Sequence, residues 1–122
     1  MASKTIKIKP NYNPRFHRFT KKQSKPFQAV LQEVIEDEIL LNPLVGQQKI
    51  ADLADFWIYK FTHQKKEFLI AYCFPQFQGR GDELRRLLGK KTQADLEIEL
   101  LMIDFVQVGT HENFYRELKT LK

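Results

Sequence analysis

The sequence has 122 residues, of which 43% are hydrophobic and 29% are charged. This length supports one hydrophobic core rather than two, and this composition excludes a disordered chain and a fibrous repeat. The 20 Lys and Arg residues exceed the 15 Asp and Glu residues by five, which is compatible with a polyanionic partner but does not by itself establish one. We therefore expect a single domain over residues 1–122.

Cysteine content and hydropathy bear on the location of the protein. Cys73 is the single cysteine and cannot form a disulfide within the chain. Residues 1–9 contain lysines but not the apolar run of a signal peptide, and no apolar run approaches the roughly 18 residues that span a membrane. These features predict a cytoplasmic protein without a membrane segment.

The charges are grouped along the chain. Residues 1–26 contain eight cationic side chains and no carboxylate, and residues 60–93 contain eight cationic side chains and three carboxylates. The intervening segment 27–59 and the segment 94–122 carry net charges of −5 and −3. If the two basic segments meet in space, they form a positive face suited to phosphates; the alternative is two unrelated solvated segments.

The first predicted elements are an edge strand and two helices. Residues 5–9 alternate apolar and basic side chains, as in a short edge strand. An asparagine and a proline at residues 13–14 predict the start of one helix, and a serine and a proline within residues 24–26 predict the start of another. The second helix should end at residues 42–43, because proline disfavours helical geometry in the residue before it. The two helices should form a hairpin.

The middle of the chain predicts a pair of strands. Residues 56–61 are aromatic and β-branched, and period-two alternation places Lys60 on the face opposite the aromatic side chains of this strand. Residues 68–74 are apolar on both faces, which suits a central strand. A polar break at residues 62–66 connects the two strands as a hairpin.

The last third of the chain predicts two helices and a strand. Asp82 is a candidate cap for a short helix over residues 83–88. Residues 100–108 are a second apolar strand, and the preceding residues 96–99 fit either a strand or a helix. Thr110 is the candidate cap of a final helix with an apolar stripe.

Several kinds of chemistry lack their sequence motifs. The histidines His17, His63 and His111 are far apart in the sequence, without the paired spacing of a metal site. Cys73 lies within an apolar run, where a thiol is usually inert packing. No glycine-rich phosphate loop is present. We therefore expect no metal and no cofactor.

Three segments together resemble a known family. They are residues 42–53 (NPLVGQQKIADL), 57–61 (WIYKF) and 108–119 (VGTHENFYRELK). In their order and spacing they resemble the RelE/ParE superfamily of bacterial toxins from two-gene toxin–antitoxin modules. The resemblance covers roughly residues 27–122, and residues 76–95 depart from it as an added basic segment.

This resemblance implies an α+β fold, in which an N-terminal helical hairpin packs on a small twisted antiparallel sheet and a C-terminal helix follows. It also implies a cognate antitoxin partner and two candidate activities. RelE-like members cut messenger RNA, commonly on the ribosome, whereas ParE-like members poison DNA gyrase and are not known for a hydrolytic site. The leading hypothesis is a metal-independent mRNA endonuclease that inhibits translation; the alternative is a gyrase inhibitor without catalytic residues.

The nuclease hypothesis implies a set of site residues. His111 can act as an acid or a base near neutral pH, and its place after the last strand matches the catalytic histidine or arginine of the nuclease members. Tyr115 matches their aromatic RNA-positioning residue, and Lys60 matches the lysine that they present to the scissile phosphate. Further candidates for binding phosphates are Lys49, His63, Arg80, Arg85, Arg86 and Arg116.

Each of the three main candidates also has a structural interpretation. His111 could cap the final helix, Tyr115 could pack in the core, and Lys60 could be a solvated strand residue. The strand at residues 68–74 has no arginine where some nuclease members supply one. The sequence therefore leaves the mechanism open.

Overall fold

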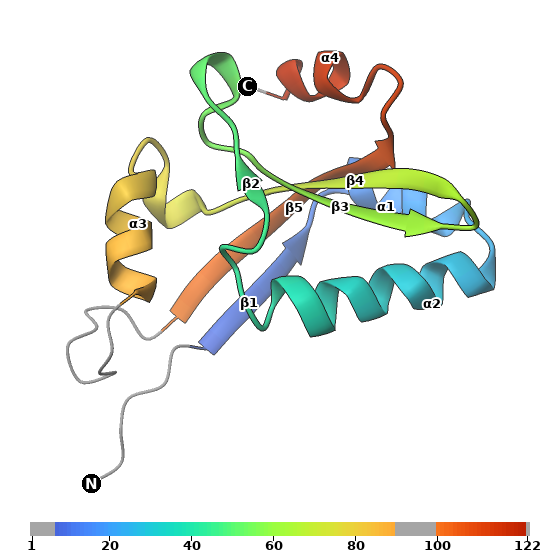
Figure 1. The fold of residues 1–122 in the computed structure, drawn as a ribbon, viewed down its shortest axis with the longest axis horizontal. Coiled ribbons are helices and arrows are strands. Elements are labelled where there is room, and N and C mark those ends of the chain that lie inside the picture. Colours follow the sequence, from blue (N-terminus) through green and yellow to red (C-terminus); the bar gives the residue numbers. More distant parts are fainter. Residues whose placement is uncertain (1–6, 90–99, 122) are drawn as a thin grey trace, which may run out of the picture.

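The computed structural model describes residues 7–89 and 100–121. Within these residues, five strands form one sheet in the order β1-β5-β4-β3-β2 (Figure 1). The strands are β1 (Lys7–Tyr12), β2 (Gln47–Gln48), β3 (Trp57–His63), β4 (Lys66–Cys73) and β5 (Leu100–Thr110). The α-helices are α1 (Pro14–Lys21), α2 (Lys25–Val34), α3 (Gly81–Leu88) and α4 (Phe114–Lys119). This mixture of helices and sheet confirms the α+β prediction.

The two N-terminal helices start where their sequence signals predict. The Asn13 side chain accepts a hydrogen bond from the backbone N–H of Phe16 at 2.8 Å, and the Ser24 hydroxyl accepts one from the N–H of Phe27 at 3.3 Å. Each cap satisfies a backbone donor that the first turn of a helix leaves free. After α2 the chain continues as a π-helical turn (Ile35–Ile39), so regular helix ends before the predicted boundary at residues 42–43.

The sheet is mixed, which corrects one detail of the expected fold. β2, β3, β4 and β5 pair antiparallel in sequence, as expected, but β1 pairs parallel to β5. No tight turn joins β1 to β5, so their connection does not impose an antiparallel direction. β1 is an edge strand, as predicted, and runs to Tyr12 rather than ending at residue 9.

Apolar side chains cover both faces of the sheet. α1 and α2 pack on one face, and α4 packs with a short 3₁₀ turn (Ala51–Leu53) on the other. Figure 1 shows α2 and α4 on opposite sides of the β3–β4 hairpin. β4 contributes to both clusters, which confirms its prediction as a central strand. The smaller cluster, which holds α4, contains Leu53, Phe56, Ile58, Leu69, Ala71, Phe114 and Leu118.

Two predicted helix caps are wrong. α3 begins at Gly81 with Arg80 at its cap position, so Asp82 lies inside its first turn. α4 begins at Phe114 after Asn113, because pairing with Phe68 extends β5 as far as Thr110. The added basic segment is described as far as residue 89; residues 90–95, and the ambiguous residues 96–99, lie outside the described part of the chain.

No helix in the described ranges is long and apolar enough to cross a membrane.

Candidate functional site

β5 and α4 hold His111 and Tyr115 on the same side of the sheet. β5 ends at Thr110, and the next residue, His111, is exposed. The buried side chains of Phe114 and Leu118 fix α4 against the sheet, and Tyr115 packs partly buried beside them. The His111 and Tyr115 rings meet edge to face with 5.8 Å between their centres. The final turn of the chain therefore places a histidine and a tyrosine side by side.

Lys49 joins this pair from the segment after β2. Its backbone N–H donates to the carbonyl oxygen of Phe56 at 2.9 Å, which anchors the start of the loop. Its Nζ atom lies 5.0 Å from the centre of the Tyr115 ring. A cation at this distance is attracted by the negative face of the ring. Lys49 and Tyr115 thus hold each other in place.

Glu67, which the sequence did not single out, is the fourth member of the group. Its Oε1 atom lies 3.7 Å from Nε2 of His111, and both side chains are about half exposed. Glu67 stands near the start of β4, on the strand that pairs with the end of β5. This cross-strand position depends on register, so no local sequence signal pointed to it.

Lys60 lies on the same face of the sheet, in the neighbouring row. It pairs with Leu69 of β4, whereas Glu67 pairs with Thr62 two residues further along β3. Side chains two residues apart on a strand share a face, so Lys60 and Glu67 are diagonal neighbours. Lys60 is exposed, on the face opposite the aromatic side chains of β3, as predicted. We call Lys49, Lys60, Glu67, His111 and Tyr115 the candidate site.

His63 lies on the opposite face of the sheet from this group, whereas Arg116 directly follows Tyr115 on α4. His63 packs edge to face on Phe27 of α2, with 5.4 Å between ring centres, and so belongs to the opposite face of the sheet. Arg116 follows Tyr115 on α4 and is exposed, but its guanidinium is hydrogen-bonded to the Asn113 side chain.

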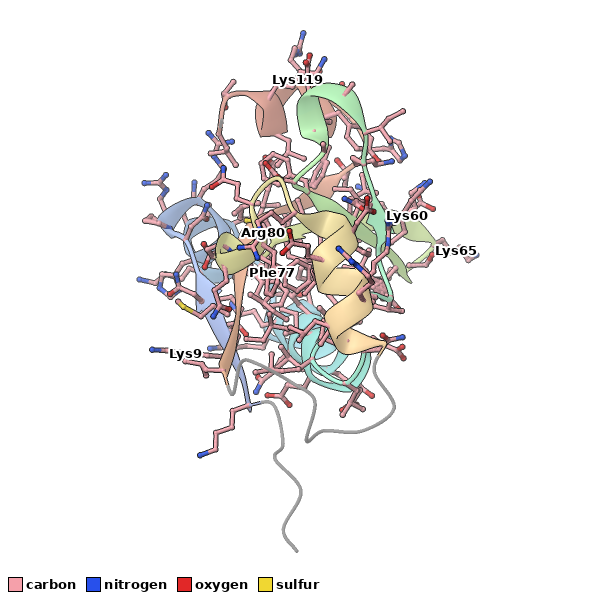
Figure 2. The ribbon with its side chains drawn as sticks, turned by 90° about the vertical axis from the view of Figure 1, so that its left-hand side faces the viewer. Lys9, Lys60, Lys65, Phe77, Arg80 and Lys119 are labelled. Carbon is pink, nitrogen blue, oxygen red and sulfur yellow. The ribbon has the colours of Figure 1, made fainter. Side chains whose placement is uncertain are left out.

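The three arginines of the added segment lie elsewhere. Arg85 stacks on Trp57, with its guanidinium carbon 5.2 Å from the ring centre. Trp57 begins β3, five residues before the Thr62 row, which is about 17 Å along a strand at roughly 3.3 Å per residue. Figure 2 shows Arg80 beside Phe77 and apart from Lys60 and Lys65. Arg85 therefore lies at the end of β3 away from Glu67, and Arg80 and Arg86 line a pocket with Gln48, Ala54 and Asp55 rather than with His111 or Tyr115.

Two of these arginines also have carboxylate partners. Arg80 pairs with Glu83, and its guanidinium lowers the pKa of that carboxyl. Arg85 lies 3.5 Å from Asp82. The end of the sheet that carries α3 is thus a mixed-charge surface rather than a purely basic one.

Two further expectations concern metal binding and the thiol. Within residues 7–89 and 100–121, no group of three His, Cys, Asp or Glu side chains is placed to hold a metal ion. Burial raises the pKa of the Cys73 thiol to about 12, which fits its interpretation as packing rather than as a nucleophile.

Chemically, the candidate site combines an imidazole, a carboxylate, two ammonium groups and a phenol ring. An imidazole and a carboxylate can transfer protons, and ammonium groups can stabilise charge that develops on a phosphate. The aromatic ring offers a surface on which a nucleobase can stack.

Comparison with protein families matches residues 11–80 to the family described as ParE-like toxin of type II bacterial toxin–antitoxin system. No curated protein and no solved structure was found to match the chain. The matched residues exceed half of the chain and contain Lys49, Lys60 and Glu67, whereas His111 and Tyr115 lie beyond them.

Proposed function

The chain belongs to the ParE-like toxin family of type II bacterial toxin–antitoxin systems, and we propose that it acts as a metal-independent endonuclease that cuts messenger RNA on the ribosome. The family implies a cognate antitoxin as its partner. The proposal includes messenger RNA as the substrate, the ribosome as a partner and the cytoplasm as the location.

The observation that carries the proposal is the convergence of His111, Glu67, Tyr115 and Lys49 on one face of the sheet, with Lys60 in the next row. Four separate parts of the chain contribute to this group, in which Lys60, Glu67 and His111 are exposed and Lys49 and Tyr115 are partly buried. A histidine whose role was only to cap a helix would not require a carboxylate, a tyrosine and lysines beside it.

RNA cleavage without a metal matches these groups. The 2′-oxygen of a ribose bonds to the adjacent phosphorus, the bond to the 5′-oxygen breaks, and a cyclic phosphate is left. One proton leaves the 2′-hydroxyl and one reaches the departing oxygen, which is the work of His111 with Glu67 beside it. Lys60 and Lys49 stabilise charge on the phosphate, and Tyr115 stacks on a neighbouring base.

The experiment is translation in a cell-free system with the purified protein and its variants. We expect the wild type to arrest translation and to cut ribosome-bound mRNA, mapped by primer extension. His111→Ala should lose at least about 100-fold in cleavage rate, in line with the usual contribution of general acid–base catalysis. Tyr115→Ala should lose about 5- to 150-fold, in line with about 1–3 kcal/mol for the stacking of one base. Exposed Lys119, at the end of α4, provides the matched control Lys119→Gln.

The ends of the RNA products test the mechanism. Attack by the 2′-hydroxyl leaves a cyclic phosphate on one fragment and a free 5′-hydroxyl on the other. A 2′-deoxy substitution at the scissile nucleotide should therefore abolish cutting. Products with a 5′-phosphate would overturn the proposed chemistry.

The alternative is inhibition of DNA gyrase, as in ParE-like members of the superfamily. It is favoured by the extent of the family match, which leaves out His111 and Tyr115. If the purified protein traps gyrase on supercoiled DNA, and if the His111→Ala variant still does so, the gyrase activity replaces the nuclease.

A further inference from the structure

The two basic segments of the sequence meet at one end of the fold. Phe27, in the first turn of α2, packs on Phe68 and His63 with 4.8 Å and 5.4 Å between ring centres. Phe19, near the end of α1, packs on Phe27 at 6.2 Å. These contacts bring the junction of α1 and α2 against the turn between β3 and β4, as Figure 1 shows.

Exposed lysines gather at the end of α1, at the start of α2 and around the turn between β3 and β4. They are Lys21, Lys22, Lys25, Lys65 and Lys66, which we call the basic end. No carboxylate in the described part of the chain lies within ion-pairing distance of any of them. Gln64 and Lys65 have φ values of 51° and 65°, as in the two-residue turns that fit the twist of a hairpin. The turn therefore holds Lys65 and Lys66 out into solvent on a rigid hairpin.

The basic end borders the candidate site. The turn residue Lys65 lies two residues before Glu67, and Phe68 pairs with Thr110, the residue before His111. Lys66 pairs with His63 and therefore points to the face of the sheet opposite Glu67. The start of β1, with Lys7 opposite Leu100, lies at the other end of the parallel β1–β5 pair. Figure 2 shows Lys65 and Lys60 on one side of the molecule and Lys9 on the other.

We propose that the basic end binds the phosphate backbone of the substrate RNA where the RNA passes the turn of the β3–β4 hairpin, at the same end of the sheet as the candidate site. This inference rests on the proposed nuclease function and adds to it the surface that grips the substrate. Lysine acts on phosphate as a point charge and does not read bases, so the grip is independent of sequence. Binding at the basic end raises the affinity for RNA but takes no part in the chemical step. Loss of these lysines should therefore raise KM and leave kcat unaltered.

The test compares two double variants that remove the same charge. Lys65→Gln with Lys66→Gln alters the basic end, and Lys7→Gln with Lys9→Gln alters exposed positions on β1. The probe is a single-stranded RNA with 2′-O-methyl riboses, which cannot be cut, and binding is measured by fluorescence anisotropy across a salt series. Unchanged thermal unfolding curves establish that both variants are folded.

We expect the salt dependence of binding to weaken only in the Lys65/Lys66 variant. Each phosphate contact on a single strand contributes about 0.7 to the slope of log K against log salt, so two lost contacts lower it by about 1.4. If the wild type and the Lys65/Lys66 variant bind the RNA with equal affinity at 1 M salt, this change in slope corresponds to about 25-fold weaker binding by the variant at 0.1 M salt.

Three results would overturn the inference. They are an equal loss in both double variants, no loss in the Lys65/Lys66 variant, and weaker binding of the antitoxin with unchanged binding of RNA, which would assign the surface to the antitoxin. Because the probe cannot be cut, this result does not depend on catalysis. Failure of the nuclease function would appear separately, in the translation and primer-extension assays.

Discussion

The side chain of Gln107 donates a hydrogen bond to the carbonyl oxygen of Phe114 over 3.0 Å. Gln107 lies on β5 with only 3% of its surface exposed, and its Oε1 atom accepts a hydrogen bond from Arg15 of α1 at 3.4 Å. Arg15 also donates to the carbonyl oxygen of Glu117 at 3.2 Å. One buried amide and one arginine thus tie α4, which carries Tyr115, to β5 and α1.

Replacement of Gln107 tests this connection. Gln107→Leu keeps a similar volume but removes the hydrogen bond, so we expect a loss of about 1 kcal/mol in the free energy of unfolding. Amide exchange should accelerate in α4 more than in α2. Gln32, which is exposed and bonded to Glu36, supplies the control Gln32→Leu. Unchanged exchange in α4 would contradict the assigned role.

Lys49 and Tyr115 give a second prediction. Lys49→Met removes the cation over the ring, which is worth about 0.5–1 kcal/mol at an exposed site, while Lys49→Arg retains it. We expect RNA cleavage to fall by at least about two- to fivefold in Lys49→Met and to recover in Lys49→Arg. Equal losses in both variants would show that the contact with Tyr115 does not matter.

The buried phenol of Tyr72 gives a third prediction. Its hydroxyl donates to the carbonyl oxygen of Pro43 and accepts from the N–H of Gly46, both at 2.9 Å. Tyr72→Phe leaves both backbone groups without this partner, so we expect a loss of about 1–3 kcal/mol in the free energy of unfolding at neutral pH. Urea denaturation followed by circular dichroism measures this loss.

The same residue predicts a response to alkaline pH. Burial raises the pKa of Tyr72 in the folded protein far above the value near 10 of the unfolded chain. The stabilisation is complete below pH 10 and declines as the pH rises above it, because only the unfolded chain then releases the proton. The wild type should lose stability above pH 10 more steeply than Tyr72→Phe. Parallel curves for the two proteins would contradict this assignment.

Gly46 gives a fifth prediction, which rests on steric contact rather than on hydrogen bonding. A Cβ atom at Gly46 would lie 2.6 Å from the Tyr72 hydroxyl and 3.0 Å from the carbonyl oxygen of Ile58. Backbone on one side and a fixed buried phenol on the other cannot both move away, so Gly46→Ala should cost about 1–3 kcal/mol. At Gly109 the nearest atom is 3.9 Å away, so Gly109→Ala is the control with ordinary contacts. Equal unfolding temperatures for the two variants would refute this explanation.

Elements with local signals could be predicted from the sequence. Asn13 and Ser24 mark helix starts because a cap and its target lie within three residues of each other. The β3–β4 hairpin could be predicted because alternating apolar residues flank a short polar turn. His111, Tyr115 and Lys60 were named from the resemblance, and the fold places them on one side of the sheet.

Features that depend on pairing between distant strands could not be predicted. The extension of β5 to Thr110 requires the partner Phe68, and the parallel direction of β1 requires the position of β5. Glu67 joins the candidate site only through the register of β4 and β5. The arginines of α3 have the positive charge that a phosphate site needs, but no sequence signal indicates at which end of β3 this helix packs.

The parallel pairing of β1 with β5 has a consequence for biosynthesis. Asn11 and Asp104, which are hydrogen-bonded across this pair, are 93 residues apart in the sequence. β5 lies between β1 and β4, so until it has been translated the sheet remains in two parts and the apolar faces of α1 and α2 are incompletely covered. Contacts of this separation form late in folding. Until β5 has been synthesised, the chain therefore cannot complete the sheet or assemble the candidate site, because His111 and Tyr115 follow this strand.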